Sequence, residues 1–316
     1  MAEIGKDIAK AKAILESGGL VGIPTETVYG LAGNALDPDA VAKIFAVKNR
    51  PDFDPLIIHT SSIEQISKYT LEIIPALESL ANVFWPGPLT LLLPRKSIIP
   101  DLVTSGLDHV AVRVPQHPLT QELLAQLDFP LAAPSANPFG YISPTTAAHV
   151  NDQLGELIPY VLDGGSSEVG LESTIVGVED GQLTIYRLGG IDVADIEKVV
   201  GPVRILSHSS SNPKTPGMLK SHYAPRKKVI LGDITLMLEE HKGERIGVLS
   251  FNKKYDNADE SYILSLEGSY TEAAKNLFTA LRFLDQADVS LILAELLPEE
   301  NLGRAINDRL RRASVK

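Results

Sequence analysis

Two basic side chains, Lys48 and Arg50, lie close together, directly before Pro51. Lysine offers a point charge and arginine a planar fork, so together they suit an anionic ligand. The same pair would also complement the carboxyl end of a helix, and spacing alone favours that simpler role. Pro51 supports the first interpretation, because it ends the helix and turns the chain so that both side chains can face neighbouring strand ends.

Hydroxyl groups and a histidine flank this pair at the ends of two short apolar segments. Thr25 and Thr27 follow residues 20–23, and His59 follows residues 56–58. Ligands of an open α/β sheet bind outside the carboxyl ends of its strands. We therefore predict that a ligand pocket lies where these two segments end.

A second loop of small polar groups, Ser135-Ala136-Asn137, lies between two prolines. Taken alone it is ordinary turn chemistry. It repeats the first pattern of apolar segment, proline and polar groups, so the two loops together would line a pocket with hydrogen-bond donors. Arg113 and Ser173 are further candidates at predicted strand termini, although an exposed arginine and a plain strand start would also explain them.

Familiar catalytic motifs are absent from the sequence. It contains no G-x-x-x-x-G-K-[ST] phosphate loop, no G-x-G-x-x-G after a strand, no H-E-x-x-H and no G-x-S-x-G. Phosphates would then be held by lysine, arginine and hydroxyl groups instead of a glycine cradle. The sequence also has no cysteine, which excludes thiolate catalysis and cysteine-ligated metals. We predict no metal-ligating residues.

The elements that must position these residues alternate between short strands and helices. Helical spacing or capping signals occur at 4–17, 38–50 and 119–127, and apolar strands are expected at 20–23, 56–58, 89–93, 110–114 and 160–162. A hairpin over 173–186 turns at Asp180-Gly181. Because a hairpin accompanies helix-connected strands, we predict an α/β fold with a mixed, open sheet.

Length and composition divide the chain. At 316 residues it exceeds the usual size of one domain. Residues 1–206 would form the first domain, a linker rich in serine at its start would cover 207–225, and residues 226–316 indicate a smaller α/β unit.

The net charge of −11 weighs against broad nucleic-acid binding. No signal core or membrane-spanning run is present, so we expect a cytoplasmic protein that binds no membrane.

Taken in order, the motifs closely resemble the YrdC/Sua5 family over nearly the whole chain. The motifs that carry the resemblance are Pro24-Thr25-Glu26-Thr27-Val28-Tyr29-Gly30-Leu31, Lys48-x-Arg50-Pro51, Trp85-Pro86-Gly87-Pro88, Arg113-Val114-Pro115, Ser135-Ala136-Asn137 and Glu172-Ser173-Thr174. Pro216-Gly217-Met218 and His222-Tyr223-Ala224-Pro225, followed by an α/β tail, are similar to the longer Sua5 type.

The resemblance implies a fold and an activity. The fold would be a twisted, mixed, open sheet with helices, followed by a smaller Rossmann-like domain. The activity would be a nucleotidyl transfer that makes threonylcarbamoyl-AMP and pyrophosphate from L-threonine, bicarbonate or CO₂, and ATP, with Mg²⁺ expected at the phosphates. Downstream threonylcarbamoyl-transferase proteins would then pass the group to adenosine 37 of tRNA, so tRNA is an indirect partner.

The resemblance also assigns roles to residues by motif position. The L-threonine site would comprise Thr27, His59, Arg113, Ala133 and Ser173. The catalytic residues, which hold the ATP phosphates and bicarbonate, would be Lys48, Arg50, Ser135 and Asn137. The ATP side would be completed by Asp54, Ser143, Arg187 and Tyr223, with Tyr223 closing over ATP as part of a linker lid. Asp54 then needs a partner, because an anion beside phosphates must meet a metal, a ribose hydroxyl or the backbone.

Two alternatives belong to other classes of protein. One is a structured-RNA-binding module without catalysis, against which the net charge of −11 weighs. The other is a carbamoyl-transfer enzyme of the hydrogenase-maturation kind, which contains a related domain. Such enzymes carry a zinc finger, and this sequence has no cysteine with which to build one.

Overall fold

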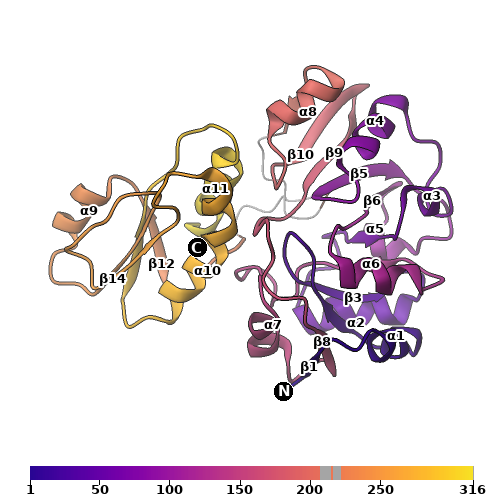
Figure 1. Ribbon diagram of the computed structural model, residues 1–316, viewed down its shortest axis with the longest axis horizontal. Helices are drawn as coiled ribbons and strands as arrows, with labels where there is room; N and C mark the ends of the chain where they lie inside the picture. The colour runs from indigo at the N-terminus through magenta and orange to yellow at the C-terminus, as the bar shows by residue number, and fades with distance from the viewer. Residues whose placement is uncertain (207–214, 216–221, 316) are drawn as a thin grey trace.

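The computed structural model describes residues 1–206, 215 and 222–315, which form two lobes of unequal size (Figure 1). The larger lobe runs from β1 (Glu3–Gly5) to β11 (Arg204–Ile205), and the smaller from β12 (Lys228–Leu231) to α11 (Gly303–Ala313). The predicted linker lid at 207–225 lies outside the described residues except for 215 and 222–225. None of the described helices is long and apolar enough to cross a membrane.

The larger lobe is built on a sheet of eleven strands. Their spatial order is β1, β8 (Tyr160–Leu162), β2 (Val21–Ile23), β3 (Gly30–Asn34), β7 (Leu131–Ala132), β4 (Ile57–His59), β6 (His109–Arg113), β5 (Leu89–Pro94), β9 (Thr174–Glu179), β10 (Gln182–Arg187) and β11. Parallel pairs such as β4 and β6 lie beside antiparallel pairs such as β5 and β6. The predicted mixed sheet is therefore confirmed, and β9 and β10 form the predicted hairpin.

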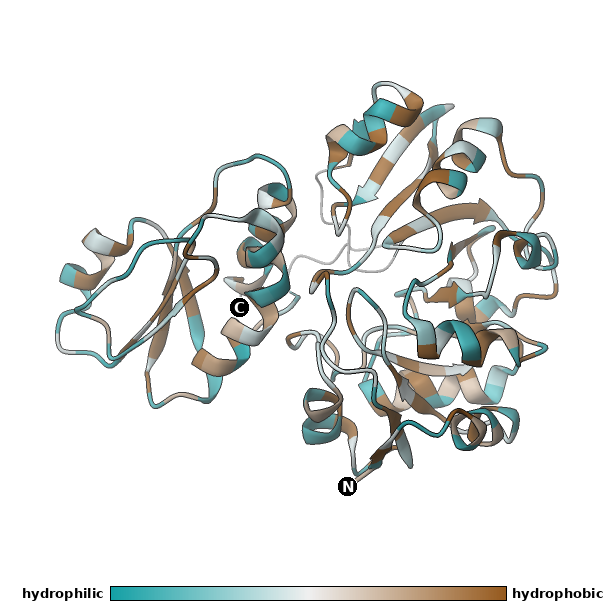
Figure 2. Cartoon of the chain, viewed as in Figure 1, coloured by the Kyte–Doolittle hydropathy of each residue, from teal (hydrophilic) through white to brown (hydrophobic). Residues whose placement is uncertain are grey.

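Helices connect and cover these strands (Figure 1). They are α1 (Ile8–Glu16), α2 (Pro38–Lys48), α3 (Ile63–Ile66), α4 (Pro75–Phe84), α5 (Asp101–Thr104), α6 (Pro118–Ala125), α7 (Ala147–Leu154) and α8 (Val193–Val200). The strands that they cover are rich in hydrophobic residues, and the larger core cluster joins side chains from the sheet and from these helices (Figure 2).

The bounds of α2 follow from its capping residues. The Asp37 side chain accepts a hydrogen bond from the Asp39 N–H at the start, and Pro38 takes the first helical position. The helix ends at Lys48 because Asn49 adopts the left-handed conformation, with φ of 50°. Arg50 and Pro51 therefore lie beyond the helix, which is ended by the left-handed Asn49 and not, as predicted, by the proline.

The smaller lobe contains a second, wholly parallel sheet. Its strands lie in the order β12, β15 (Leu291–Ala294), β13 (Ile246–Ser250) and β14 (Glu260–Ile263), and its helices are α9 (Ile234–Glu240), α10 (Tyr270–Gln286) and α11. This arrangement confirms the predicted smaller α/β domain. The first sheet ends at Ile205 and the second begins at Lys228, so we propose to keep the domain bounds predicted above.

Four strands, β1, β3, β11 and β14, were not predicted from the sequence. The β3 sequence Gly-Leu-Ala-Gly-Asn lacks β-branched residues and contains two glycines, which weaken a strand in isolation. It forms because β2 and β7 both pair with it in antiparallel register. Tertiary pairing thus determines this strand against its local preference.

The two lobes meet through α10 and α11, which lie on the side of the smaller lobe nearest the larger one (Figure 1). Tyr141 donates a hydrogen bond from its hydroxyl to Asp285 Oδ2 on α10, at 2.6 Å. Arg282 of α10 donates to the Ile142 and Ser143 carbonyls. The second lobe is thereby fixed to the loop that follows Asn137.

Candidate functional site

One cavity brings together most of the predicted site residues. Nine of them line it: Thr27, Arg50, His59, Arg113, Ala133, Ser135, Ser173, Arg187 and Tyr223. Four predicted residues do not line it and are buried beside or behind the wall: Lys48, Asp54, Asn137 and Ser143. The lining also includes residues that the sequence did not assign to the site: Val28, Ile57, Pro134, Glu172 and His222.

Arg113 lines the cavity and is held by several protein groups. It ends β6, and the parallel register places it opposite His59, the last residue of β4. Its guanidinium donates from Nη1 to Thr27 Oγ1 at 2.7 Å and from Nε to the Gly87 carbonyl at 3.2 Å. Its Nη2 lies 2.7 Å from Glu26 Oε1. Arg113 is buried, which resolves the alternative of a surface arginine.

His59 is held as a neutral imidazole. Its side chain is 3% exposed, and burial, with a smaller contribution from the Arg113 charge, lowers its pKa to about 3. Its Nδ1 is buried and has no hydrogen-bond partner within the described structure. A buried polar atom without a partner is costly, so this nitrogen is suited to contact a ligand.

Lys48 fixes the second polar loop. Its Nζ donates to the backbone carbonyls of Ser135 and Asn137, each at 2.5 Å. Burial, reinforced by the nearby Arg50 charge, lowers the Lys48 pKa well below its ordinary value. The Asn137 amide nitrogen in turn donates to the Pro138 and Tyr141 carbonyls. Lys48 and Asn137 therefore shape the loop that carries Ser135 into the cavity.

Asp54 has a protein partner. Its Oδ2 lies 2.9 Å from Arg50 Nη2, and the same guanidinium donates to the Asp54 and Pro55 carbonyls. Burial raises the pKa of Asp54, although the Arg50 charge opposes this shift. The partner that the sequence left open is thus Arg50. The described residues contain no group of three or more histidine, aspartate or glutamate side chains arranged to hold a metal ion.

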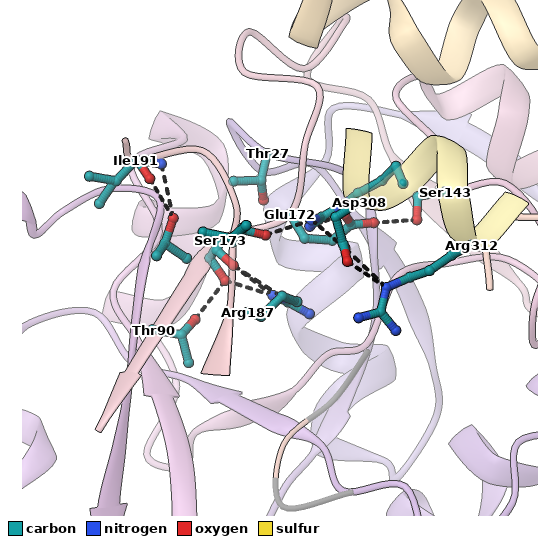
Figure 3. Close-up of polar contacts among 12 residues, drawn as sticks. Thr27, Thr90, Ser143, Glu172, Ser173, Arg187, Ile191, Asp308 and Arg312 are labelled. Carbon is teal, nitrogen blue, oxygen red and sulfur yellow. Dashed lines mark hydrogen bonds and ion pairs between the residues drawn. The ribbon is translucent and has the colours of Figure 1, made fainter. Parts of the chain in front are cut away.

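The base of the β9–β10 hairpin forms another part of the cavity wall, where Ser173 and Arg187 lie side by side (Figure 3). Arg187 Nη2 donates to Ser173 Oγ at 3.0 Å, and the same oxygen lies 2.7 Å from Thr90 Oγ1. Beside them, the Ser143 hydroxyl donates to Glu172 Oε1 at 2.6 Å. Ser143 therefore reaches the cavity through Glu172, which lines it.

Tyr223 and His222 close one side of the cavity. Tyr223 is 1% exposed, and burial raises its pKa to about 12, so its hydroxyl keeps its proton. The two rings contact each other edge to face, with centroids 4.2 Å apart. Burial, followed by the Arg50 and Lys48 charges, lowers the His222 pKa well below its ordinary value. His222 was not predicted as a site residue, although it belongs to the same His222-Tyr223-Ala224-Pro225 motif as Tyr223, which was.

The cavity combines three arginines with hydroxyl groups, two neutral imidazoles and one carboxylate. Such a donor set, withdrawn from water, binds carboxylate and phosphate groups in fixed positions and stabilises negative charge that develops between them.

The comparisons with known proteins define the class of protein first. Residues 13–189 match the Sua5/YciO/YrdC family, whose description reads "Telomere recombination", and residues 191–315 match "Threonylcarbamoyl-AMP synthase, C-terminal domain". The fold and cavity thus belong to the Sua5/YrdC class with its additional second domain.

Individual relatives identify the family within this class more specifically. The chain is 42% identical to the threonylcarbamoyl-AMP synthase of Pyrococcus abyssi, over 96% of this chain and 93% of that protein. It is 39% identical to the synthase of Bacillus subtilis, over 97% and 92%. The crystal structure of P. abyssi Sua5 complexed with L-threonine superposes with a TM-score of 0.92 at 40% identity, covering 99% of this chain and 97% of that one. The chain therefore belongs to the two-domain Sua5 family of threonylcarbamoyl-AMP synthases, and it is an enzyme, as the resemblance predicted.

Proposed function

We propose that this enzyme makes threonylcarbamoyl-AMP and pyrophosphate from L-threonine, bicarbonate or CO₂, and ATP. The observation that carries the proposal is a single cavity in which Arg50, Arg113 and Arg187 face hydroxyl groups outside the strand ends. That set suits an amino-acid carboxylate bound beside phosphates. The names of the relatives and the L-threonine complex of the P. abyssi protein support the same assignment.

L-Threonine is assigned to the side formed by Thr27, His59 and Arg113. The arginine fork suits its carboxylate, and a neutral His59 does not repel its ammonium group. The Ala133 carbonyl is the group available at its position, because the Ala133 N–H already bonds to the Ile57 carbonyl at 3.1 Å. The Ser173 hydroxyl completes this side.

ATP is assigned to the side formed by Arg50, Ser135, Arg187 and Tyr223, which line the cavity. The buried residues behind them, Lys48, Asn137, Asp54 and Ser143, remain assigned to this side because their hydrogen bonds and ion pairs fix the lining residues. Bicarbonate would bind between the two substrates, beside Ser135 and Arg50.

In this reaction the protein must position the substrates and stabilise the negative charge that develops. The threonine ammonium loses a proton to solvent, and the amine attacks CO₂ and loses a second proton to form an N-carboxylate. One carboxylate oxygen then attacks the α-phosphorus of ATP, and the bond from that phosphorus to the α,β-bridging oxygen breaks and releases pyrophosphate. Negative charge accumulates in both steps, without a covalent enzyme intermediate. Preorganised arginines in a cavity withdrawn from water stabilise such charge.

Mg²⁺ would enter with ATP and neutralise its phosphate oxygens. Protein carboxylates are poorly placed to hold it, because Asp54 is paired with Arg50 and Glu172 accepts from Ser143. The product would pass to threonylcarbamoyl-transferase proteins that modify adenosine 37 of tRNA in the cytoplasm.

The test is pyrophosphate release from ATP with and without L-threonine and bicarbonate. Release that requires both, and that collapses in Ser135→Ala, is the expected result. Ser105→Ala, which changes a serine outside the cavity, serves as the matched control. Release without threonine would point to another acceptor or to an ATPase. No release under any condition would favour the RNA-binding alternative, for which tRNA filter binding over a salt series should then show a steep slope.

A further inference from the structure

Arg309, on α11 of the second lobe, contacts residues of the first lobe although it does not line the cavity itself. Its side chain is fully buried. Nε and Nη2 donate to Glu172 Oε2 at 3.1 and 3.0 Å, and Nη1 donates to the Leu188 carbonyl at 2.6 Å. All three nitrogens of the guanidinium thus bond across the interface between the lobes.

The two partners of Arg309 flank the β9–β10 hairpin in the sequence, and both lie at its open end. Glu172 lies just before β9, and Leu188 directly follows β10. At the base of the hairpin, between these partners, are Ser173 and Arg187, which are joined to each other and line the cavity. Arg309 therefore ties together the two chain ends from which these lining residues project.

A third contact reaches the ATP side. The Arg309 guanidinium carbon lies 5.3 Å from the centroid of the Tyr223 ring, within the range of a cation–π contact. The Tyr223 ring also contacts the Phe278 ring of α10, with ring centroids 5.5 Å apart. The second lobe thus supports Tyr223 from two helices.

Glu172 links Arg309 to a further residue of the ATP side. One of its oxygens accepts from Arg309 and the other from Ser143 at 2.6 Å. With both oxygens engaged, the carboxylate has a fixed orientation against the cavity. Without Arg309 it would be a buried anion with one neutral donor, and it would be expected to turn toward the remaining cations of the wall, of which Arg187 is one.

We propose that Arg309 is a positioning residue for the ATP side of the active site, and that the second domain serves catalysis by supplying it. This inference rests on the proposed function. Arg309 acts through Glu172, Leu188 and Tyr223, and through them sets the positions of Arg187 and Ser143. On the threonine side, Ser173 belongs to the base of the β9–β10 hairpin, but its hydroxyl is also held by Thr90 Oγ1 at 2.7 Å. The other side chains there, Thr27, His59 and Arg113, do not contact Arg309.

The test is steady-state kinetics on Arg309→Met and Arg309→Lys, with ATP and L-threonine varied separately. We expect KM for ATP to rise at least tenfold in Arg309→Met and KM for L-threonine to change less than threefold. Arg309→Lys keeps the charge but loses the planar guanidinium. KM for ATP should therefore rise less than in Arg309→Met, and again more than KM for L-threonine. Arg311→Met is the matched control, because Arg311 lies on the same helix, is 52% exposed and pairs with Glu299 of its own lobe.

Thermal melts and circular dichroism separate positioning from stability. A second control, Tyr141→Phe, breaks an interlobe hydrogen bond whose partners do not line the cavity, and should lower the melting temperature without the KM split. A folded Arg309→Met with wild-type KM for ATP would overturn the inference. If wild-type protein shows no threonine-dependent release, the proposed function fails, and the affinity of each variant for a fluorescent ATP analogue then decides the inference by itself.

Discussion

Arg113 Nη2 lies 2.7 Å from Glu26 Oε1, and each of the two side chains is 5% exposed. The arginine that we propose as the partner of the threonine carboxylate is thus already paired with a carboxylate of the protein. The other carboxylate oxygen of Glu26 accepts from the Gln116 N–H at 3.0 Å, which fixes the glutamate in place. Because a bound amino-acid carboxylate would share this guanidinium with Glu26, the pair sets both the stability of the loop and the charge offered to the substrate.

We first predict that Glu26→Gln destabilises the protein by about 3–5 kcal/mol, since it leaves Arg113 buried without its counter-ion. L-Threonine should offset part of this loss, because its carboxylate restores a negative charge beside Arg113. Urea unfolding with and without saturating L-threonine measures both effects, with the exposed Glu122→Gln as control. Equal stabilisation of wild type and variant by threonine would contradict the assignment of its carboxylate to Arg113.

The second prediction concerns Lys48. Lys48→Met removes the donor to the Ser135 and Asn137 carbonyls and leaves both oxygens without that partner. We expect threonine-dependent pyrophosphate release to fall at least a hundredfold, because the loop that carries Ser135 loses its anchor. Lys43→Met is the control: Lys43 lies on the same helix and also donates to a backbone carbonyl, that of Gly18, but it is exposed. Retained activity in Lys48→Met would show that the loop holds its shape without the lysine.

A third prediction is a pH dependence of stability that originates at His59. Its pKa falls from 6.5 to about 3 on folding because it is buried, so below pH 6.5 the unfolded chain binds a proton that the folded chain does not. The stability contributed by the neutral ring is complete above pH 6.5 and is lost as the pH falls toward 3. At pH 5 the loss amounts to about 2 kcal/mol.

Replacing His59 tests this sign directly. Between pH 7.5 and pH 5, the free energy of unfolding measured in urea should fall by about 2 kcal/mol less in His59→Asn than in wild type. His109→Asn, which changes an exposed histidine of the neighbouring β6, should keep the wild-type slope. A wild-type slope in His59→Asn would mean that other groups dominate the acid sensitivity.

The fourth prediction separates the ring of Tyr223 from its hydroxyl. Tyr223→Ala removes a buried ring that contacts His222, Phe278 and Arg309. We expect the free energy of unfolding to fall by about 3–5 kcal/mol and KM for ATP to rise. Tyr223→Phe keeps the ring and should stay near wild type in KM. Unfolding curves and ATP titrations of both variants measure these effects, and a KM shift of equal size in Tyr223→Phe would assign the role to the hydroxyl instead.

The position of the site was readable from local patterns. Proline after a short apolar segment marks where a strand ends, and this signal correctly placed Thr27 and Ser135 at one cavity. Arg113 and His59 were likewise predicted at strand ends, and the structure places them opposite each other in parallel register. Local sequence suffices in these cases because strand ends are determined by residues a few positions away.

The sequence motifs did not show which of the predicted residues line the cavity and which are buried behind its wall. Lys48 and Asp54 stand in the same motif as Arg50, yet Arg50 lines the cavity while the other two lie behind its wall. Spacing indicates that side chains are close in the chain, whereas the surface that each one faces depends on the packing of α2 against the loop that carries Ser135.

The sequence by itself determined the alternation of elements, the mixed sheet, the division into two unequal parts and the family. Only the tertiary structure decided that Arg309 of the second domain contacts Glu172, Leu188 and Tyr223, at and beside the cavity wall. Glu172 and Arg309 are 137 positions apart, and neither pattern nor motif links them. The physical reason is that a buried ion pair across two lobes exists only once both have folded and docked, because its geometry and its desolvation depend on the packing of each.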